Sequence, residues 1–214
     1  MRSKRYHAAV LARAAHLFLE HGYGATSDAS IYTGIASKGW FYSNFREGKV
    51  DVARAIMEIS LSTEGLQPQR LVTQLIYDIG MLLAYKITVE EEYLAALKLS
   101  FDPNAKHYGG PWEQWVAFNT AQLREAQDNG EIMKHISPEA EARQIPASWS
   151  GQVQITLAVD GNLDNLHTHM NRVYRNWLGG MVNRRILAQV DLDPLRGMKL
   201  YDAYVLGRDS TTEM

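Results

Sequence analysis

The chain has 214 residues, of which 46% are hydrophobic, a composition that suits a folded globular protein and not a disordered one. It contains no cysteine, which excludes disulfides, thiolate zinc sites and cysteine nucleophiles. The net charge of −2 is unevenly spread: residues 1–55 hold eight basic and four acidic side chains, a net +4, and the rest holds 14 basic and 20 acidic, a net −6. A basic N-terminal part favours phosphate contact at one end only.

The N-terminal part predicts three helices in close succession. Apolar residues recur at spacings of three and four over residues 10–19, which is typical of an amphipathic helix. Gly22 is expected to end this helix as a left-handed cap. Thr26 or Ser27 can cap a short second helix and Ser37 a third, because a hydroxyl there accepts hydrogen bonds from free backbone N–H groups.

The middle of the chain predicts further helices separated by loops. A fourth helix is expected over residues 46–61, followed by the clearest break in the sequence, Gly65-Leu-Gln-Pro68, which we interpret as a hinge. Residues 69–87 predict a long apolar helix. Asp-Pro-Asn and Gly-Gly over residues 101–110 predict a loop, and Pro111 begins a helix in which proline is favoured in the first turn.

The last third of the chain also shows helical patterns. Ser137 and the proline after it open a helix, which Pro146 is expected to kink or restart. Residues 163–187 predict a last long helix, weakened at Gly179-Gly180, and the final residues predict a short helix and a loose tail. No strand-like alternation and no internal repeat is visible, so the predicted fold class is all-α.

The third short helix carries polar and aromatic residues suited to reading DNA. A helix over residues 37–44 that follows another short helix has the layout of a helix-turn-helix unit. Lys38 suits phosphate or guanine contact, and Gly39 allows close approach of the backbone. We expect Phe41 to pack in the core of this unit and leave the role of Trp40 open. The residues expected at DNA are Thr26, Ser27, Ser37, Lys38, Gly39, Trp40, Tyr42, Ser43, Asn44 and Lys49.

These residues resemble the TetR family of bacterial repressors. The family motif of Gly-Tyr, Thr-Ser, Ser-Lys-Gly-x-x-Tyr-x-x-Phe and Lys is matched by Gly22-Tyr23, Thr26-Ser27, Ser37–Phe45 and Lys49. The resemblance implies a DNA-binding domain over residues 1–62 and a ligand-binding and dimerisation domain over residues 69–205. The chain departs from the motif in four ways: it is one residue short before Ser37, its turn glycine Gly34 lies one place early with Ile35 where glycine is expected, it carries an extra Gly48, and Trp40 replaces a small residue.

The second part of the chain is rich in aromatic residues. Most such residues form a hydrophobic core, but polar groups directed into an aromatic cavity are what a small, mostly apolar ligand requires. Trp112 and Trp115 lie three residues apart on one predicted helix, and Gln152 and Thr156 lie four apart on another. The residues expected at a ligand are Met81, Tyr85, Phe101, Trp112, Trp115, Phe118, Trp149, Gln152 and Thr156.

This second part resembles the γ-butyrolactone receptor branch of the TetR family. The shared series is Pro111-x-x-x-Trp115, Ala126 to Ile132, Ser137-Pro-Glu139, Gly151-x-x-Gln154 with Gln152 inside it, and Asp191 to Gly197. The resemblance implies that Trp115 lies in a pocket for a lactone, butenolide or furan signal. Gln152 is its expected polar partner, and Gln154 remains an alternative.

The resemblance also implies a homodimer that binds double-stranded operator DNA. The two last long helices are expected to pair, with an apolar face formed by Ile155, Leu166, Met170, Val173, Tyr174 and Trp177. Control of antibiotic production or differentiation is implied in the same way. No stretch of about 18 apolar residues free of charge and no secretory signal is visible, so we expect a cytoplasmic protein without a membrane segment.

Other functions find little support in the sequence. His167 and His169 point to different sides of a helix, so a shared metal ion is not expected. No phosphate loop, Ser-His-Asp order or His-Glu-x-x-His motif is present, and we expect neither an enzyme nor a cofactor. Two alternatives remain open: a TetR-like sensor of a different small molecule, and a ligand-binding protein that has lost DNA binding through the altered spacing.

Overall fold

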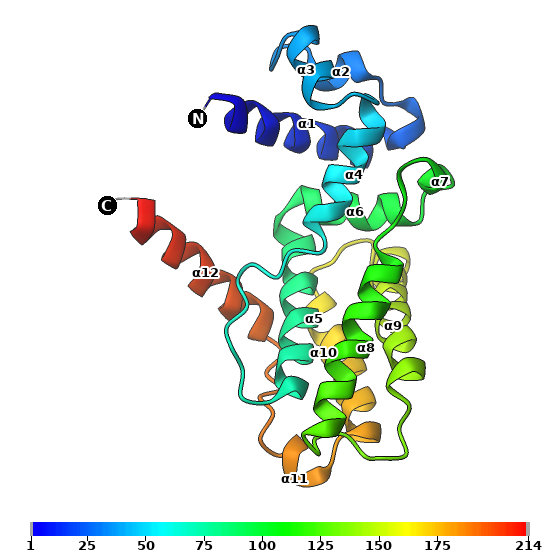
Figure 1. Ribbon diagram of the computed structural model, residues 1–214, viewed down its shortest axis with the longest axis vertical. Helices are drawn as coiled ribbons and strands as arrows, with labels where there is room; N and C mark the ends of the chain where they lie inside the picture. The colour runs from blue at the N-terminus through cyan, green and yellow to red at the C-terminus, as the bar shows by residue number, and fades with distance from the viewer. Residues whose placement is uncertain (1, 213–214) are drawn as a thin grey trace. The chain divides into compact units, whose positions relative to one another are not determined.

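The computed structural model describes residues 2–212 and consists of helices joined by loops (Figure 1). Within this range the backbone pairs in a β-like manner only at an isolated bridge between Ile132 and Val182. The predicted all-α class is therefore confirmed. The helices are α1 (Arg2–Ala25), α2 (Asp28–Tyr32), α3 (Lys38–Asn44), α4 (Lys49–Ile59), α5 (Val72–Val89), α6 (Glu91–Ser100), α7 (Ala105–Tyr108), α8 (Trp112–Asp128), α9 (Pro138–Asp160), α10 (Leu166–Met181), α11 (Arg184–Leu187) and α12 (Arg196–Thr212).

The chain forms two compact units, each with its own core. The first, here called the head, contains the residues up to Ser62 together with Val89–Pro111. The second, here called the body, contains Thr63–Thr88 and the residues from Trp112 onward. A functional division at residues 62 and 69 remains a prediction.

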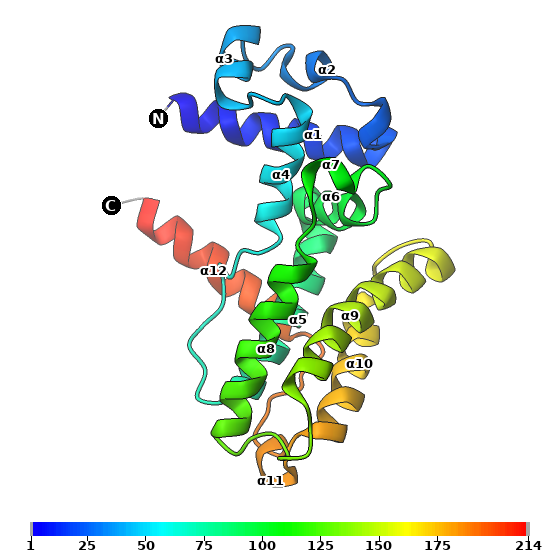
Figure 2. The same ribbon diagram turned by 45° about the vertical axis from the view of Figure 1, so that its right-hand side comes forward.

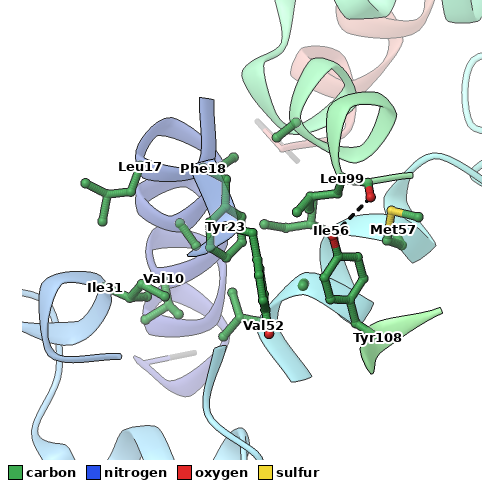
Figure 3. Close-up of a cluster of buried hydrophobic side chains, with 14 of the residues drawn as sticks. Val10, Leu17, Phe18, Tyr23, Ile31, Val52, Ile56, Met57, Leu99 and Tyr108 are labelled. Atoms are coloured by element: carbon green, nitrogen blue, oxygen red, sulfur yellow. Dashed lines mark hydrogen bonds between the residues drawn. The ribbon is translucent and has the colours of Figure 1, made fainter. Parts of the chain in front are cut away.

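The core of the head is formed by α1, α4 and α6 around aromatic residues (Figure 3). The Tyr23 ring lies 4.7 Å from that of Tyr108, whose hydroxyl donates to the carbonyl of Leu99 at 3.0 Å. Gly22 adopts a φ of +79° inside α1, which breaks the helix where the sequence predicts its end. The segment of α6 and α7 was assigned to the second domain from sequence, yet its buried residues complete the core of the head.

In the body, α5 is the central helix and carries mostly buried side chains. Both ribbon views show α8 and α9 side by side, and α10 packs against α9 (Figures 1 and 2). By length and composition α5 could cross a membrane, but 72% of it is buried inside the protein. It also contains the buried charged residues Asp78 and Lys86, so we describe it as the core helix of a folded domain.

The two ends of the central helix are held by charged side chains. The buried carboxylate of Glu131 accepts hydrogen bonds from the backbone N–H groups of Val72 and Thr73 at 3.0 and 2.8 Å, so it caps the N-terminus of α5 from another element. The Nζ atom of Lys86 donates to the carbonyl of Glu64 at 2.9 Å and lies 5.5 Å from the ring centroid of Tyr204 on α12. These contacts attach α5 to three distant parts of the chain.

Several predicted helix boundaries were wrong. Pro146 neither ends nor restarts α9, which continues from Pro138 to Asp160 with the proline inside it. The predicted helix over residues 163–187 instead divides into α10 and α11, and α10 ends immediately after Gly179-Gly180. Residues 196–212, predicted as a short helix and loose tail, form the 17-residue helix α12.

Candidate nucleic-acid interface and ligand-binding body

The helix-turn-helix unit is defined by two capped short helices. The Ser27 hydroxyl accepts from the backbone N–H of Ser30 at 3.1 Å and begins α2, while the Ser37 hydroxyl accepts from the backbone N–H of Trp40 at 3.1 Å and begins α3. Gly34, with a φ of +82°, lies in the turn between them. The structure thus places two predicted DNA residues, Ser27 and Ser37, at helix N-termini, where their hydroxyls hold backbone N–H groups.

The exposed side of α3 is polar. Lys38, Gly39, Ser43 and Asn44 are exposed, and Tyr42 retains 39% of its surface. The Ser43 hydroxyl and the Asn44 amide both donate to the Trp40 carbonyl at 2.8 Å, so these two side chains lie along the helix. Among the predicted DNA residues, this set forms one exposed surface that can meet a phosphate or a base edge.

Aromatic residues fix α3 from its other side. Phe41 is fully buried, as expected from the sequence. Trp40 is half-buried, with its ring 5.5 Å from that of Tyr6 and 6.4 Å from that of Phe45, both in edge-on geometry. The bulky Trp40 therefore packs α3 against α1, which answers the question that the sequence left open.

Two predicted DNA residues are engaged inside the head. The buried Thr26 hydroxyl donates to the Gly22 carbonyl at 2.9 Å. The Lys49 Nζ atom donates to the carbonyls of Tyr23 and Thr26 at 2.8 and 2.7 Å and lies 4.5 Å from the centroid of the Tyr23 ring. Lys49 thereby provides hydrogen-bond donors and a positive charge to the carbonyl groups at the end of α1, where the helix dipole favours a cation. In this arrangement both Thr26 and Lys49 stabilise the fold of the head.

Tyr42 has a carboxylate partner that the sequence did not indicate. Its hydroxyl donates to the Oδ2 atom of Asp28 at 2.8 Å. This hydrogen bond to a charged acceptor raises the pKa of Tyr42 above its usual value, since removing the proton would leave two anions in contact.

The predicted ligand residues of the body fall into separate groups. On α5, Tyr85 stacks edge-on with Tyr201 of α12 at 5.3 Å, and the backbone of buried Met81 lies against Gly197 of α12. A Cβ atom on Gly197 would lie 2.0 Å from the Met81 carbonyl oxygen, so only glycine permits this approach. These two predicted residues therefore belong to the α5–α12 contact.

A second group lies on α8 and a third on α9. Trp115 and Phe118 on α8 are half-buried with ring centroids 5.8 Å apart, and Trp112, one turn earlier, is also half-buried. On α9 the Gln152 amide donates to the buried Thr156 hydroxyl at 3.1 Å, and it lies 3.5 Å from the Nδ1 atom of His169 on α10. His169 was missed as a neighbour of this polar pair because the turn between α9 and α10 separates them in sequence.

Trp149 lines a small hollow between α9 and α10. The indole Nε1–H donates to the carbonyl of Gly80 on α5 at 3.0 Å, and the hollow is also lined by Ile145, Tyr174 and Trp177. Neither Gln152 nor Trp115 lines this hollow. The remaining predicted ligand residue, Phe101, is half-exposed and belongs to the head.

Sequence reasoning missed the polar network that joins α5 to α12. The carboxylate of Asp78 is fully buried and pairs with Arg196 through two hydrogen bonds of 2.8 and 2.9 Å. Gln74 donates to the same carboxylate at 2.7 Å and accepts from the backbone N–H of Asp191. An acidic residue in an otherwise apolar helix is the one sequence signal that points to such a partner.

The two capped short helices form a helix-turn-helix unit, and the body is all-α within the described residues. A scan against known family models finds no match. The A-factor receptor protein of Streptomyces griseus is 26% identical over 180 residues, which cover 83% of this chain. The chain spans 64% of the length of that curated relative.

Solved structures share the fold over nearly the whole chain. A TetR regulator of Streptomyces fradiae, TylP, is 25% identical, with a TM-score of 0.86 over 95% of this chain and 99% of that one. A γ-butyrolactone receptor described as ArpA-like is 19% identical, with a TM-score of 0.70 over 95% and 100%. The chain therefore has the TetR fold, and its resemblance to the γ-butyrolactone receptor branch is confirmed.

Proposed function

We propose that the protein is a homodimeric, DNA-binding transcriptional repressor of the cytoplasm. A small signalling ligand of γ-butyrolactone, butenolide or furan type releases it from its operator. The regulated process is antibiotic production or differentiation, and the protein catalyses no reaction. The likeness to receptors and TetR regulators supports this proposal.

The observation that carries the DNA-binding half is the exposed polar surface of α3. Its cap at Ser37 and its packed aromatic side hold the helix in place, while Lys38, Ser43 and Asn44 remain exposed. The net charge of +4 over residues 1–55 adds attraction for phosphate. Both are properties that a major-groove reader requires.

The ligand-binding half rests on aromatic and polar groups of the body. The Trp115–Phe118 pair offers an apolar wall, and Gln152 and Thr156 offer hydrogen-bonding groups. A ligand that binds the DNA-free arrangement better than the DNA-bound one shifts the population away from the operator. Two alternatives remain: a repressor that responds to a different small molecule, and a ligand-binding protein that no longer binds DNA.

The first experiment is fluorescence anisotropy at fixed salt with labelled duplex DNA. The probes are the region upstream of this gene and duplexes enriched from a random-sequence pool by the unaltered protein. We expect tight binding that a γ-butyrolactone releases. Binding that the lactone leaves unchanged would support the proposed DNA-binding function and refute the proposed ligand class. Failure to enrich any duplex would refute the proposed DNA binding.

A further inference from the structure

Asp28 connects all three short helices that follow α1. It is the first residue of α2, and its Oδ2 atom accepts from the hydroxyl of Tyr42 on α3 at 2.8 Å. Its Oδ1 atom accepts from the backbone N–H of Lys49, the first residue of α4, at 2.9 Å. One negative charge therefore lies at the N-termini of both α2 and α4, where the helix dipoles favour it. The same carboxylate also binds the hydroxyl of Tyr42 on α3.

The extra residue Gly48 makes room for this carboxylate. Gly48 is buried, has a φ of +61° and provides no side-chain cap for α4. A Cβ atom at this position would lie 2.2 Å from the Oδ2 atom and 2.8 Å from the Cγ atom of Asp28. Both the positive φ and the closeness of the Asp28 carboxylate require glycine at position 48. The position of the Asp28 carboxylate therefore depends on Gly48.

The hydrogen bond to Asp28 limits what Tyr42 can do at DNA. A phenol has one proton to donate, and phosphate oxygens only accept hydrogen bonds. While the Tyr42 proton is directed at Asp28, the hydroxyl cannot donate to a phosphate. The ring of Tyr42 also contacts those of Phe41 and Tyr32, at 5.2 and 6.4 Å, so the side chain follows the surface between α2 and α3.

We propose that Asp28 is a positioning residue for sequence recognition, which acts on α3 through Tyr42 and on α4 through Lys49 without touching DNA itself. Tyr42 is accordingly a link between helices and not a phosphate contact. The proposal rests on the proposed DNA-binding function. It differs from that function in a measurable way, because the position of α3 affects base readout, whereas a phosphate contact contributes to binding of every sequence.

The test is a double-mutant cycle with Tyr42→Phe, Asp28→Ala and the double variant. The probes are the duplex enriched by the unaltered protein and a scrambled duplex of the same composition. We expect each single variant to lower the ratio of the two affinities by about three- to tenfold, the scale of one hydrogen bond. The double variant should lower it no further, and binding of the scrambled duplex should stay unchanged.

Two additions separate this role from a purely structural one. Asp28→Asn retains an acceptor for the Lys49 N–H and an amide that can donate to the Tyr42 oxygen, so it should restore most of the affinity ratio. Circular dichroism melts of each variant identify any that fail to fold. If Asp28→Ala fails to fold, the test rests on a lowered affinity ratio in Tyr42→Phe and a retained ratio in Asp28→Asn.

The outcomes are distinct. Equal weakening on both duplexes by Tyr42→Phe, additive with Asp28→Ala, would make Tyr42 a direct phosphate contact and overturn the proposal. An unchanged affinity ratio in both single variants would also overturn it. Failure of the unaltered protein to enrich any duplex would overturn the proposed function, and the positioning role with it, before any variant is compared.

Discussion

Hydroxyl and carboxylate side chains determine where the short helices of the head begin. Ser27 and Ser37 each hold a free N–H group of the following helix, and Asp28 holds that of α4. Substituting such a cap by alanine costs about 1 kcal/mol of stability. Ser27, Ser37 and Asp28 are thus engaged with backbone groups, whereas the cation of Lys38 on α3 is exposed.

Lys38→Ala is expected to weaken DNA binding on every sequence. If Lys38 meets one phosphate, the slope of log affinity against log salt should become shallower by about 0.9, since one fewer counterion is released. Anisotropy titrations at several salt concentrations measure this slope. The matched control is Lys106→Ala on α7, an exposed lysine of the same unit; an equal change in both variants would contradict a specific role for Lys38.

Trp115→Ala is expected to reduce the lactone response without affecting DNA affinity. The substitution removes half of the Trp115–Phe118 wall but leaves the head unchanged. The measurement is the lactone concentration that releases half of the bound DNA. Trp177→Ala, in the hollow between α9 and α10, serves as the comparison; loss of response there, with Trp115→Ala unaffected, would move the ligand site to that hollow.

Glu131→Gln should destabilise the body by about 1–3 kcal/mol, because a buried group that accepts from two backbone N–H groups and the Thr73 hydroxyl loses its charge and one acceptor atom. Urea unfolding followed by circular dichroism measures the loss. Glu125→Gln on the exposed side of α8 is the control and should change stability little. Similar curves for both variants would contradict the capping role.

At the scale of elements, helix starts were the most predictable feature. Ser137 caps α9 and Ser37 caps α3 as the sequence predicts, because a capping hydroxyl acts over three residues. Pro146 does not restart the helix as one of the two predicted outcomes had it. A proline costs its helix one hydrogen bond, but burial of residues on both sides of it, including Ile145 and Val153, retains the helix. Local rules therefore succeed at caps and fail where tertiary packing decides.

The pairing of α5 with α12 could not be read from sequence. Asp78 and Arg196 are 118 residues apart, and no local pattern links them. The same limit applies to the candidate ligand residues. Their helices were largely recognised, but the faces they occupy depend on packing among α5, α8, α9 and α12, so the predicted set separates into several groups.

Arg196→Leu is expected to destabilise the protein by about 3–5 kcal/mol, because the Asp78 carboxylate, 1% exposed, would stay buried without its cationic partner. Lys199→Leu is the matched control, since Lys199 also joins α12 to an aspartate but its side chain is 62% exposed. The control should change stability little, because an exposed ion pair is screened by solvent. Chemical unfolding of both variants gives the comparison, and equal losses would contradict a dominant buried pair.

At the scale of the whole molecule, the structure revises the expected dimer surface. Leu166, Met170 and Tyr174, predicted on that surface, are buried within the single chain. The large hydrophobic residues exposed on α9 are Ile155 and Val159, which keep 60% and 75% of their surface. An apolar strip left on one helix is what a symmetric partner can cover.

Ile155→Glu is expected to shift the protein from dimer to monomer, since it places a charge in the proposed apolar interface. Light scattering coupled to size exclusion measures the mass directly. Leu195→Glu, at an apolar residue 41% exposed outside α9, is the control and should leave the mass unchanged. A dimer that survives Ile155→Glu at all concentrations would place the interface elsewhere.

The distance between Asp78 and its partner also has a consequence for synthesis on the ribosome. The head is complete once the chain has been made as far as Pro111, so it can fold early. The body is completed later, because Asp78 in its central helix pairs with Arg196, which is translated 118 residues later. During that interval the nascent chain consists of a complete head and an incomplete body. The apolar helix α5 is then the segment that a chaperone would bind.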